Sequence, residues 1–512
     1  MAPSRPGAAV TSPRFRAALS RARDLCLRDA RVLAVAAAVV LLARLGAPPL
    51  WTQEGRWGSI CREMLRSGDL LHPRLLGEIY DDKPPVSYWL MIAAARVIGG
   101  LTEAALRLPD ALAGALTLAC TVRIATRLWD RRTALIAGWV LLSTCLFPWW
   151  ARIASADMLN VAAVIAALAW YVEIRESPGF FARAGFLVLL AVGALMKGLI
   201  APALAVACVA PDLVRQKRWR AWTRPSTALA LPVAALVYLA PFAIAGKAQA
   251  EEGLAMVFRE NVLRFFAPFD HRDSPFLYLL YLPLYALPWT PCLVAALVRC
   301  ARDRRLAGSA PRWIAGAWCL SLALLTASGS RRGYYVLPLL PLGALLVAEW
   351  LASRAPGDRL VRWSTALAVA SIGGQLAWHV GIAPWLAATG GKPALGADVK
   401  TVCDELAPGA KWTYASAGAT VAAVFYVAPP DAAPIRVPFR DDGGVRDLAA
   451  RTDALVVVAT LVDAPRLERA LPGAARVEER SPLPPELDWL AKPPDRTHVA
   501  FVVVRAAKPA AR

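Results

Sequence analysis

The sequence predicts a polytopic α-helical membrane protein with a small α/β domain at its C-terminal end. Three observations predict this class. Apolar residues make up 57% of the 512 residues, and charged residues make up only 19%, below the roughly 25% of soluble domains. The apolar residues gather in long blocks, as membrane-crossing helices require. The last part of the chain instead holds short apolar runs separated by Pro and Gly.

The distribution of basic residues predicts how the chain is oriented in the membrane. The chain has 58 Lys and Arg against 38 Asp and Glu, a formal net charge of +20. In a soluble protein this excess would favour a nucleic-acid partner. Here much of the Arg lies in short loops between apolar blocks, where basic residues mark the cytoplasmic side. We therefore expect contact with membrane lipids and no nucleic-acid partner.

The N-terminal segment, residues 1–31, is basic and lacks the cleavage pattern of a signal peptide. The positive-inside rule places it in the cytoplasm, and the first crossing follows at residues 32–50. Residues 51–104 then form the first periplasmic loop. Within this loop Trp57, Ile60, Met64 and Leu65 recur at helical spacing, which predicts an amphipathic helix on the membrane surface.

The membrane domain, residues 32–387, is expected to make about eleven to thirteen crossings. Most later crossings are expected near residues 105–128, 133–150, 158–174, 225–245, 276–298, 313–329, 334–351 and 363–387. The block 186–214 is too long for one crossing, so we expect two short spans that turn at Lys197. The block 86–101 would place the Arg-rich turn at 123–132 outside if it crossed fully, so we expect an interfacial or re-entrant segment.

Residues 388–512 are expected to form the periplasmic α/β domain. The runs ALVVVAT (454–460) and HVAFVVVR (498–505) are rich in β-branched residues and predict strands. They alternate with the helical patterns VRDLAARTD (445–453) and APRLERAL (464–471). This alternation is typical of a sheet covered by helices.

Ionisable residues from five separate loops are expected on the periplasmic side. They are Glu54, Asp81, Asp82, Lys83, Asp157, Lys197, Arg264, His271, Arg331 and Arg332. Each one alone fits a solvated loop charge. Together they indicate a functional site, because charges at membrane depth are costly. The cations also lie beside Trp- and Tyr-rich apolar segments that suit a lipid phosphate.

A series of motifs runs through the same loops. The motifs are QEGRW (53–57), REMLRSGDLLHPRLLGEIYDDKPPVSYW (62–89), RLPDAL (107–112), ARIASAD (151–157), MKG (196–198), ENVLRFFAPFDHRDSPFLYLLYLPLYALPW (260–289) and SGSRRGYYVLPLLP (328–341). In order and spacing this series resembles the GT-C glycosyltransferases, the superfamily of the bacterial lipid A 4-amino-4-deoxy-L-arabinose transferases and the protein mannosyltransferases (glycosyltransferase families 83 and 39). The resemblance covers roughly residues 30–350.

The resemblance implies a multi-pass protein of the bacterial inner membrane whose active site faces the periplasm. Such enzymes move a sugar from a polyprenyl phosphate donor to a periplasmic acceptor in one inverting displacement, and lipid A phosphate is the acceptor we expect. Lys83 matches the family position beside the donor phosphate. Lys197, Arg264 and Arg331 are the next candidates to bind that phosphate, whose negative charge grows as it leaves.

The sequence departs from the family at its first carboxylate. Members of the family that the chain resembles usually have Asp-Glu at the start of the first loop, whereas this chain has Gln53-Glu54. A hydroxyl acceptor needs a base, which would be either Glu54 or Asp157. A phosphate acceptor needs none, because it is already ionised at pH 7. The Gln therefore favours a phosphate acceptor such as lipid A, or a loss of activity.

A divalent metal ion is the one cofactor that the resemblance suggests. Asp82 and His271 match positions that can hold such an ion in the aminoarabinose transferases. Two protein ligands fall short of an ordinary zinc site, which has three or four. A solvated His is also the commoner situation in a polar loop, so the residues themselves argue only weakly for a metal.

Other functions remain open from the sequence. One is a protein or other glycan O-glycosyltransferase of the same fold, and another is a non-catalytic binder of lipid-linked sugar. A transporter would be expected to show internal repeats and paired broken helices, and the sequence shows neither. Kinases, P-loop enzymes and dinucleotide-binding proteins are not supported, because their phosphate-binding motifs are absent from the sequence.

Overall fold

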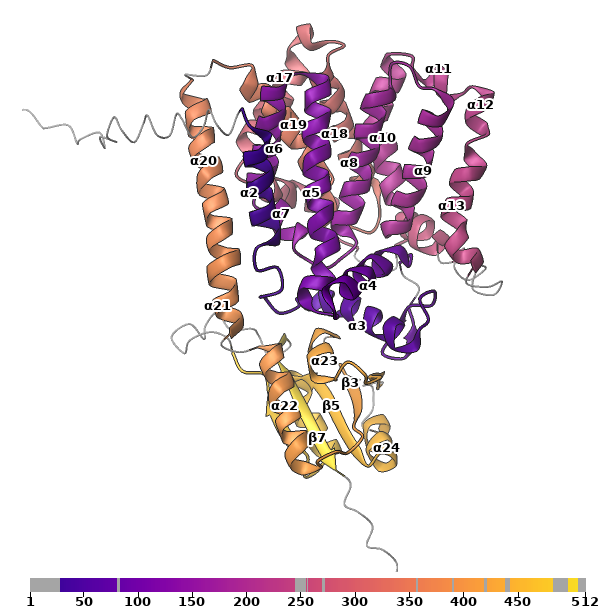
Figure 1. Ribbon diagram of the computed structural model, residues 1–512, viewed down its shortest axis with the longest axis vertical. Helices are drawn as coiled ribbons and strands as arrows, with labels where there is room; N and C mark the ends of the chain where they lie inside the picture. Colours follow the sequence, from indigo (N-terminus) through magenta and orange to yellow (C-terminus); the bar gives the residue numbers. More distant parts are fainter. Residues whose placement is uncertain are drawn as a thin grey trace, which may run out of the picture.

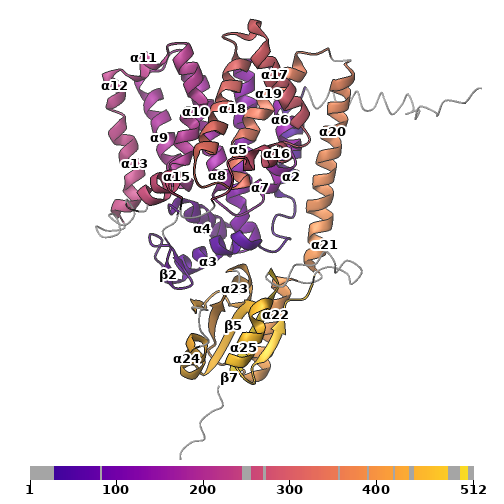
Figure 2. The same cartoon turned by 180° about the vertical axis from the view of Figure 1, so that it is seen from behind.

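The computed structural model describes residues 28–80, 83–244, 255, 257–268, 272–355, 358–388, 391–418, 421–437, 443–481 and 496–504. In this part of the chain a bundle of helices forms one end of the molecule and an α/β domain forms the other (Figure 1). Helices α3 (Thr52–Ser67) and α4 (Val86–Ile98) lie between them, across the end of the bundle (Figures 1 and 2).

The long helices of the bundle run roughly side by side. They are α2 (Ala30–Leu42), α5 (Glu103–Leu128), α6 (Arg131–Ser143), α8 (Asp157–Ile174), α9 (Phe180–Lys197), α10 (Ile200–Arg215), α13 (Leu231–Ile244), α17 (Thr290–Arg302), α18 (Ala310–Ala327), α19 (Leu339–Ala352) and α20 (Arg359–Leu376). Shorter elements connect them, namely α7 (Leu146–Ala151), α11 (Trp219–Trp222), α12 (Pro225–Ala228), η1 (Arg259–Leu263), α15 (Arg264–Phe266), α16 (Leu277–Tyr285), η2 (Arg304–Leu306), η3 (Gly333–Val336), η4 (Ala377–Ile382) and α21 (Ala383–Ala388).

Among the described residues, five helices are long and apolar enough to cross a membrane. They are Glu103–Leu128, Asp157–Ile174, Phe180–Lys197, Pro225–Ile244 and Arg359–Leu386. The bent pair α16 and α17 would make a sixth span, and α2, α4 and α19 are shorter apolar helices. The chain is therefore a multi-pass membrane protein. The expected eleven to thirteen crossings also require the shorter helices, so that number stays a prediction.

The predicted turn at Lys197 is confirmed. Helix α9 ends at Lys197, and α10 begins at Ile200. Gly198 between them has a φ of +117°, which L side chains rarely adopt. A Cβ atom at this glycine would also lie 2.6 Å from Oδ1 of Asn261, so both the backbone and the neighbouring side chain require glycine here.

The predicted crossing at residues 276–298 is not one continuous helix. The structure instead has two helices, α16 and α17, with an angle of 111° between them. Pro288 lies in the break and Pro291 in the first turn of α17. A proline removes a backbone N–H and clashes with the preceding turn, so an apolar block of sufficient length does not continue as one helix here.

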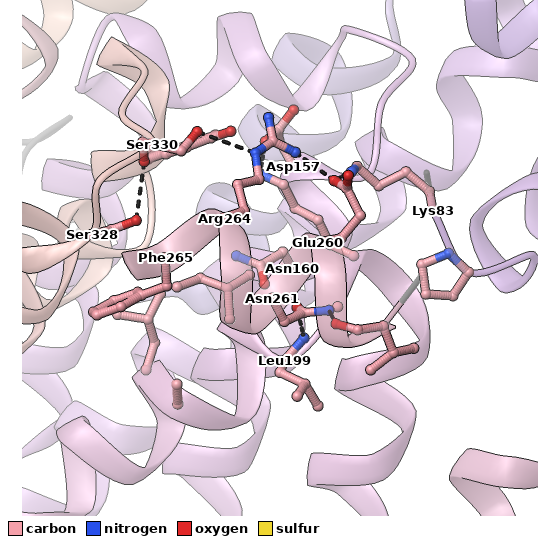
Figure 3. Close-up of a pocket in the computed structure, with 18 of the residues that line it drawn as sticks. Lys83, Asp157, Asn160, Leu199, Glu260, Asn261, Arg264, Phe265, Ser328 and Ser330 are labelled. Carbon is pink, nitrogen blue, oxygen red and sulfur yellow. Dashed lines mark hydrogen bonds and ion pairs between the residues drawn. The ribbon is translucent and has the colours of Figure 1, made fainter. Parts of the chain in front are cut away.

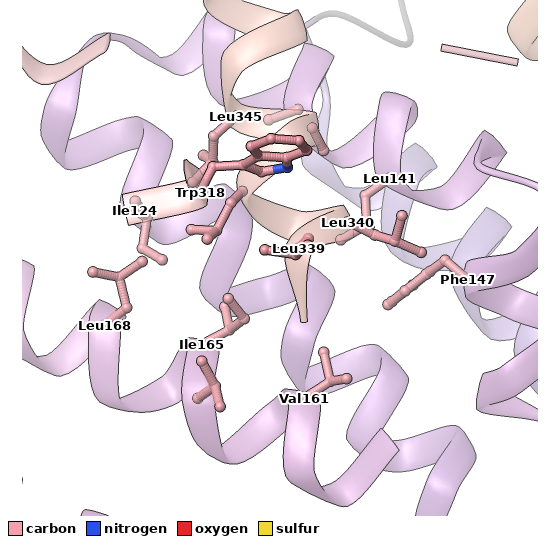
Figure 4. Close-up of a cluster of buried hydrophobic side chains, with 14 of the residues drawn as sticks. Ile124, Leu141, Phe147, Val161, Ile165, Leu168, Trp318, Leu339, Leu340 and Leu345 are labelled. Atoms are coloured by element: carbon pink, nitrogen blue, oxygen red, sulfur yellow. The ribbon is translucent and has the colours of Figure 1, made fainter. Parts of the chain in front are cut away.

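The core of the bundle is apolar and is centred on α19. This helix buries twelve of its fourteen residues, as expected for a helix surrounded by other helices. Figure 4 shows Leu339, Leu340 and Leu345 of α19 packed among side chains of α5, α6, α8 and α18. This packing fixes the beginning of α8 and the segment before α19, which both line the cavity described below.

The predicted C-terminal α/β domain is confirmed. Its five strands lie in the order β4-β3-β5-β7-β6, with β3 parallel to β4 and β5, and β7 antiparallel to β5 and β6. The strands are β3 (Thr413–Ala417), β4 (Ile435–Arg436), β5 (Ala454–Thr460), β6 (Ala475–Glu478) and β7 (His498–Val504). The helical elements are α22 (Lys392–Leu406), α23 (Val421–Val427), α24 (Gly443–Arg451), η5 (Leu461–Asp463) and α25 (Ala464–Ala470).

The α/β domain packs on α3 through α23. Of the four residues predicted for the apolar face of α3, Trp57, Ile60 and Met64 are buried, whereas Leu65 is 36% exposed. On the side facing α23, the guanidinium of Arg62 donates to the carbonyls of Phe425 at 2.6 Å and Ala428 at 2.8 Å. The first loop also contains a short hairpin of β1 (Arg74–Leu75) and β2 (Glu78–Ile79). The α/β domain thus contacts α3, the first helix of the first loop.

Candidate functional site

A cavity of about 280 Å³ opens where the bundle meets the first loop. Polar side chains reach it from the segment before α4, from the beginning of α8, from the end of α9 and from η1 and α15 (Figure 3). They include Lys83, Asp157, Asn160, Lys197, Glu260 and Arg264. Apolar side chains of α10, α13 and α18 complete the lining. One cavity therefore offers both charged groups and a hydrocarbon wall.

Two of the cations share one carboxylate. Oε2 of Glu260 lies 2.6 Å from Nη1 of Arg264 and 3.6 Å from Nζ of Lys83 (Figure 3). The guanidinium of Arg264 also donates to Oγ of Ser330 at 3.2 Å. Since the side chain of Glu260 is only 9% exposed, this carboxylate partly neutralises two cations that could otherwise face an anionic ligand.

The third cation is paired with the carboxylate at the beginning of α8. Nζ of Lys197 donates to Oδ1 of Asp157, and both side chains are at most 15% exposed. The ammonium group also lies 4.7 Å from the ring centroid of Tyr335 and 5.6 Å from that of Tyr334, within the range of cation–π attraction.

The turn that carries Lys197 is held from two sides. Oγ of Ser87, near the start of α4, donates to the carbonyl of Met196. On the other side Oδ1 of Asn261 accepts the N–H of Leu199 at 2.7 Å, while its Nδ2 donates to the carbonyl of Val257 at 2.8 Å. The position of Lys197 therefore depends on both α4 and η1.

The segment that leads into Asp157 is held by two buried carboxylates. Glu54 accepts the N–H of Ala154 at 2.8 Å, and Asp110 accepts the N–H of Ser155 at 3.1 Å. Oγ of Ser155 in turn accepts the N–H of Asp157 at 3.1 Å. These contacts fix the direction from which Asp157 enters the cavity.

Glu54 itself is occupied in an ion pair. Arg107 donates to its two oxygens at 2.7 and 2.8 Å, and the N–H of Trp51 donates to it at 2.7 Å. The residue is 1% exposed and does not appear among the described residues that line the cavity. A carboxylate with all these donors is poorly placed to remove a proton from a substrate.

Four of the predicted site residues, Lys83, Asp157, Lys197 and Arg264, line the same cavity. Arg331 does not appear in the described lining, because its guanidinium donates to the carbonyls of Thr326 and Asp273 at 2.8 to 3.1 Å.

The predicted metal ligands Asp82 and His271 lie outside the described residues. Within the described ranges, no group of three or more His, Cys, Asp and Glu side chains could hold a metal ion.

Sequence reasoning missed Glu260, Asn160 and the Tyr334–Tyr335 pair. For Glu260 and Asn160, the sequence contains a pattern that could have identified them. Glu260 precedes Arg264 by four residues and Asn160 follows Asp157 by three, so each shares a helix face with a predicted site residue. The tyrosines follow the basic pair Arg331–Arg332 directly, but nothing in the local pattern shows that they turn toward Lys197.

Comparisons with solved structures show the fold. The structure of ArnT from Cupriavidus metallidurans bound to undecaprenyl phosphate superposes with a TM-score of 0.75 and 19% identity, over 94% of this chain and 99% of that one. An oligosaccharyltransferase from Archaeoglobus fulgidus superposes with a TM-score of 0.53 and 12% identity, over 86% and 69% of the two chains. This chain has the GT-C fold.

Sequence relatives support the same assignment. Residues 82–244 match the dolichyl-phosphate-mannose-protein mannosyltransferase family. The undecaprenyl phosphate-α-4-amino-4-deoxy-L-arabinose arabinosyl transferase of Pectobacterium carotovorum is 31% identical over 67% of this chain and 64% of its own length. The Pseudomonas aeruginosa (strain UCBPP-PA14) enzyme of the same name is 32% identical over 63% and 59%. The chain thus spans somewhat less than two thirds of these relatives.

The predicted resemblance to the aminoarabinose transferases is confirmed. Together, the apolar helices and the bacterial relatives identify a multi-pass protein of the bacterial inner membrane.

Proposed function

We propose that this chain is an inverting glycosyltransferase that moves 4-amino-4-deoxy-L-arabinose from undecaprenyl phosphate to a phosphate of lipid A. The observation that carries this proposal is one cavity in which Lys83, Lys197 and Arg264 adjoin an apolar wall from α10, α13 and α18. Such a cavity suits a lipid with an anionic head. The names of the sequence relatives supply the sugar and the lipid carrier.

The active site would face the periplasm. The basic loop around α11 lies at the end of the bundle away from the α/β domain (Figure 1). Basic loops favour the cytoplasmic side. The cavity is lined by residues of α15 and of the segment before α4, and these helices lie toward the other end of the bundle (Figure 2). The same rule would place both the cavity and the α/β domain in the periplasm.

Lys83 and Arg264 would stabilise the leaving phosphate. In the donor the phosphate is a diester with one negative charge, and it leaves as a monoester with more negative charge. Cations that are already in place stabilise this growing charge without reorganisation in the transition state. The ion pairs with Glu260 hold both cations toward one point, so they are oriented before the donor binds.

The transfer step needs no proton removal when the acceptor is a phosphate. An acceptor oxygen would attack the anomeric carbon, the bond from that carbon to the lipid phosphate oxygen would break, and the electron pair would stay on the leaving phosphate. Asp157 would hold Lys197 beside the reacting groups. Glu54, bound by Arg107, would position the segment before Asp157 rather than act as a base.

The experiment that tests this function is mass spectrometry of lipid A from wild-type, deletion and Lys83→Ala strains. We expect the deletion and Lys83→Ala to remove a pentosamine-sized mass from lipid A. Lys400→Ala is the matched control, because Lys400 is exposed on α22, where its ammonium pairs with Asp404, and it does not appear in the described lining of the cavity. Unchanged lipid A in the deletion strain would contradict the acceptor. Loss of sugar from a protein or another glycan would then identify the other transferase function.

A further inference from the structure

We propose that Asn160 binds the sugar of the donor, and not its phosphate, and that it thereby helps to select which sugar is transferred. This inference rests on the proposed function, because it assumes that the cavity holds a sugar joined to a lipid phosphate. It adds a residue that contacts the part of the donor that differs between transferases.

Asn160 has a buried acceptor with no partner. It lies on α8, one turn after Asp157, and lines the cavity (Figure 3). The residue is 3% exposed, and its backbone N–H donates to the carbonyl of Ala156 at 3.0 Å. Its side-chain oxygen Oδ1 is buried and has no hydrogen-bond partner in the described structure. Buried polar atoms are nearly always hydrogen-bonded, so an exception in a cavity indicates a missing ligand group.

Asn261 shows what a structural asparagine in the same cavity looks like. It also lines the cavity, but its oxygen accepts the N–H of Leu199 and its nitrogen donates to the carbonyl of Val257. Asn261 therefore has a complete role within the protein. Asn160 has no such role for its oxygen, although it lies one turn after Asp157 on α8 and lines the same cavity.

The chemistry of the missing group follows from the atom that is left over. A side-chain carbonyl oxygen only accepts hydrogen bonds. The ionised donor phosphate has no hydrogen to give, and an isoprenoid tail has no polar hydrogen at all. Sugar hydroxyl and ammonium groups both donate. Of the parts of a polyprenyl-phosphate-linked amino sugar, only the sugar satisfies Oδ1 of Asn160.

Paired binding measurements on the purified full-length protein test this inference. The two probes are undecaprenyl phosphate, which has no sugar, and undecaprenyl phosphate carrying 4-amino-4-deoxy-L-arabinose. We expect Asn160→Ala to bind the bare lipid phosphate within about twofold of the wild type. We expect it to bind the sugar-charged donor roughly 5- to 30-fold more weakly, as for the loss of one hydrogen bond to a charged or buried group. Asn160→Leu, which has a similar volume without polar atoms, should show the same selective loss.

Asn261→Ala is the matched control. It removes the same side chain from the same cavity, but from a residue that fixes the turn beside Lys197. We expect it to weaken both probes together. If Asn160→Ala and Asn160→Leu also weaken both probes equally, or weaken neither, Asn160 does not bind the sugar. Failure of the wild type to bind undecaprenyl phosphate would instead contradict the proposed function, so the two failures are distinguishable.

Discussion

Glu260 places a negative charge between two cations proposed to hold the donor phosphate. Its carboxylate contacts Arg264 and lies 3.6 Å from Lys83. An incoming phosphate must either displace this carboxylate or bind beside it, and both choices cost electrostatic free energy. The same competition favours release of the lipid phosphate after the sugar has left. Glu260 would therefore lower the affinity for the donor and favour release of the lipid phosphate product.

Glu260→Gln should consequently bind undecaprenyl phosphate more tightly than the wild type. We expect a gain of about tenfold, because a like charge about 4 Å away costs up to about 4 kcal/mol at an effective dielectric constant of 20, and looser orientation of Arg264 offsets part of the gain. Equilibrium binding at one fixed salt concentration measures this. Glu468→Gln, at an exposed glutamate of α25, is the control. Weaker binding by Glu260→Gln would show that the carboxylate mainly orients Arg264.

The buried pair of Glu54 and Arg107 leads to a prediction about stability. Glu54→Gln removes the charge that compensates a buried guanidinium. Breaking such a pair typically costs about 3–5 kcal/mol, so we expect a clear fall in the thermal unfolding temperature of the detergent-solubilised protein. Asp157→Asn should instead abolish transfer in the lipid A assay. An unchanged unfolding temperature together with lost transfer in Glu54→Gln would restore Glu54 as the candidate base.

At the scale of elements, α3 connects the α/β domain to the candidate site. Its first turn carries Glu54, and its later turns carry Arg62, which donates to two carbonyls at the end of α23. Burial lowers the pKa of Arg62 to about 10, so it remains charged at neutral pH. Its guanidinium also stacks 4.0 Å from the ring centroid of Phe425. Docking of the domain and positioning of Asp157 thus depend on the same helix.

Gly55 tests this connection. A Cβ atom at Gly55 would lie 2.2 Å from Cα of Ala422, so α3 and α23 approach too closely for any side chain. Gly55→Leu should separate the two helices, and we expect faster proteolysis between α21 and α22 together with reduced transfer. Gly100→Ala, where a Cβ meets nothing within 4 Å, is the control. Proteolysis of Gly55→Leu at the wild-type rate would show that the domain is held independently of this contact.

The sequence predicted some elements better than others, for physical reasons. The amphipathic face of α3 and the break at Lys197 follow from local spacing and from the length of an apolar block. The angle between α16 and α17 was missed, because mean apolarity does not register a proline-induced break. The partner of Glu54 was missed as well, since Arg107 lies 53 positions away in the chain. Local patterns cannot show which distant charges meet.

At the scale of the whole molecule, the cavity joins segments that are far apart in the chain. Lys83 precedes α4, Lys197 ends α9, Arg264 begins α15 and Tyr335 lies before α19. A ligand that contacts several of these segments binds only the folded protein, so its binding free energy adds to the free energy of unfolding.

Undecaprenyl phosphate should therefore stabilise the folded protein. At a concentration of one hundred times its Kd, the expected stabilisation is about 2.7 kcal/mol. A thermal unfolding series with increasing ligand measures the shift. In Lys83→Ala the shift should be much smaller at the same ligand concentration, whereas Lys400→Ala should keep it. Equal shifts in both variants would show that the lipid stabilises the bundle without using the predicted phosphate site.

The assembly of the cavity from distant segments has a consequence during biosynthesis. While the chain is being inserted, Lys83 and Asp157 enter the membrane region well before Arg264 and Tyr335. An unfinished chain would thus lack some of the groups proposed to hold the lipid phosphate. Under the proposed function, lipid-linked sugar in the membrane would be captured only by completed molecules.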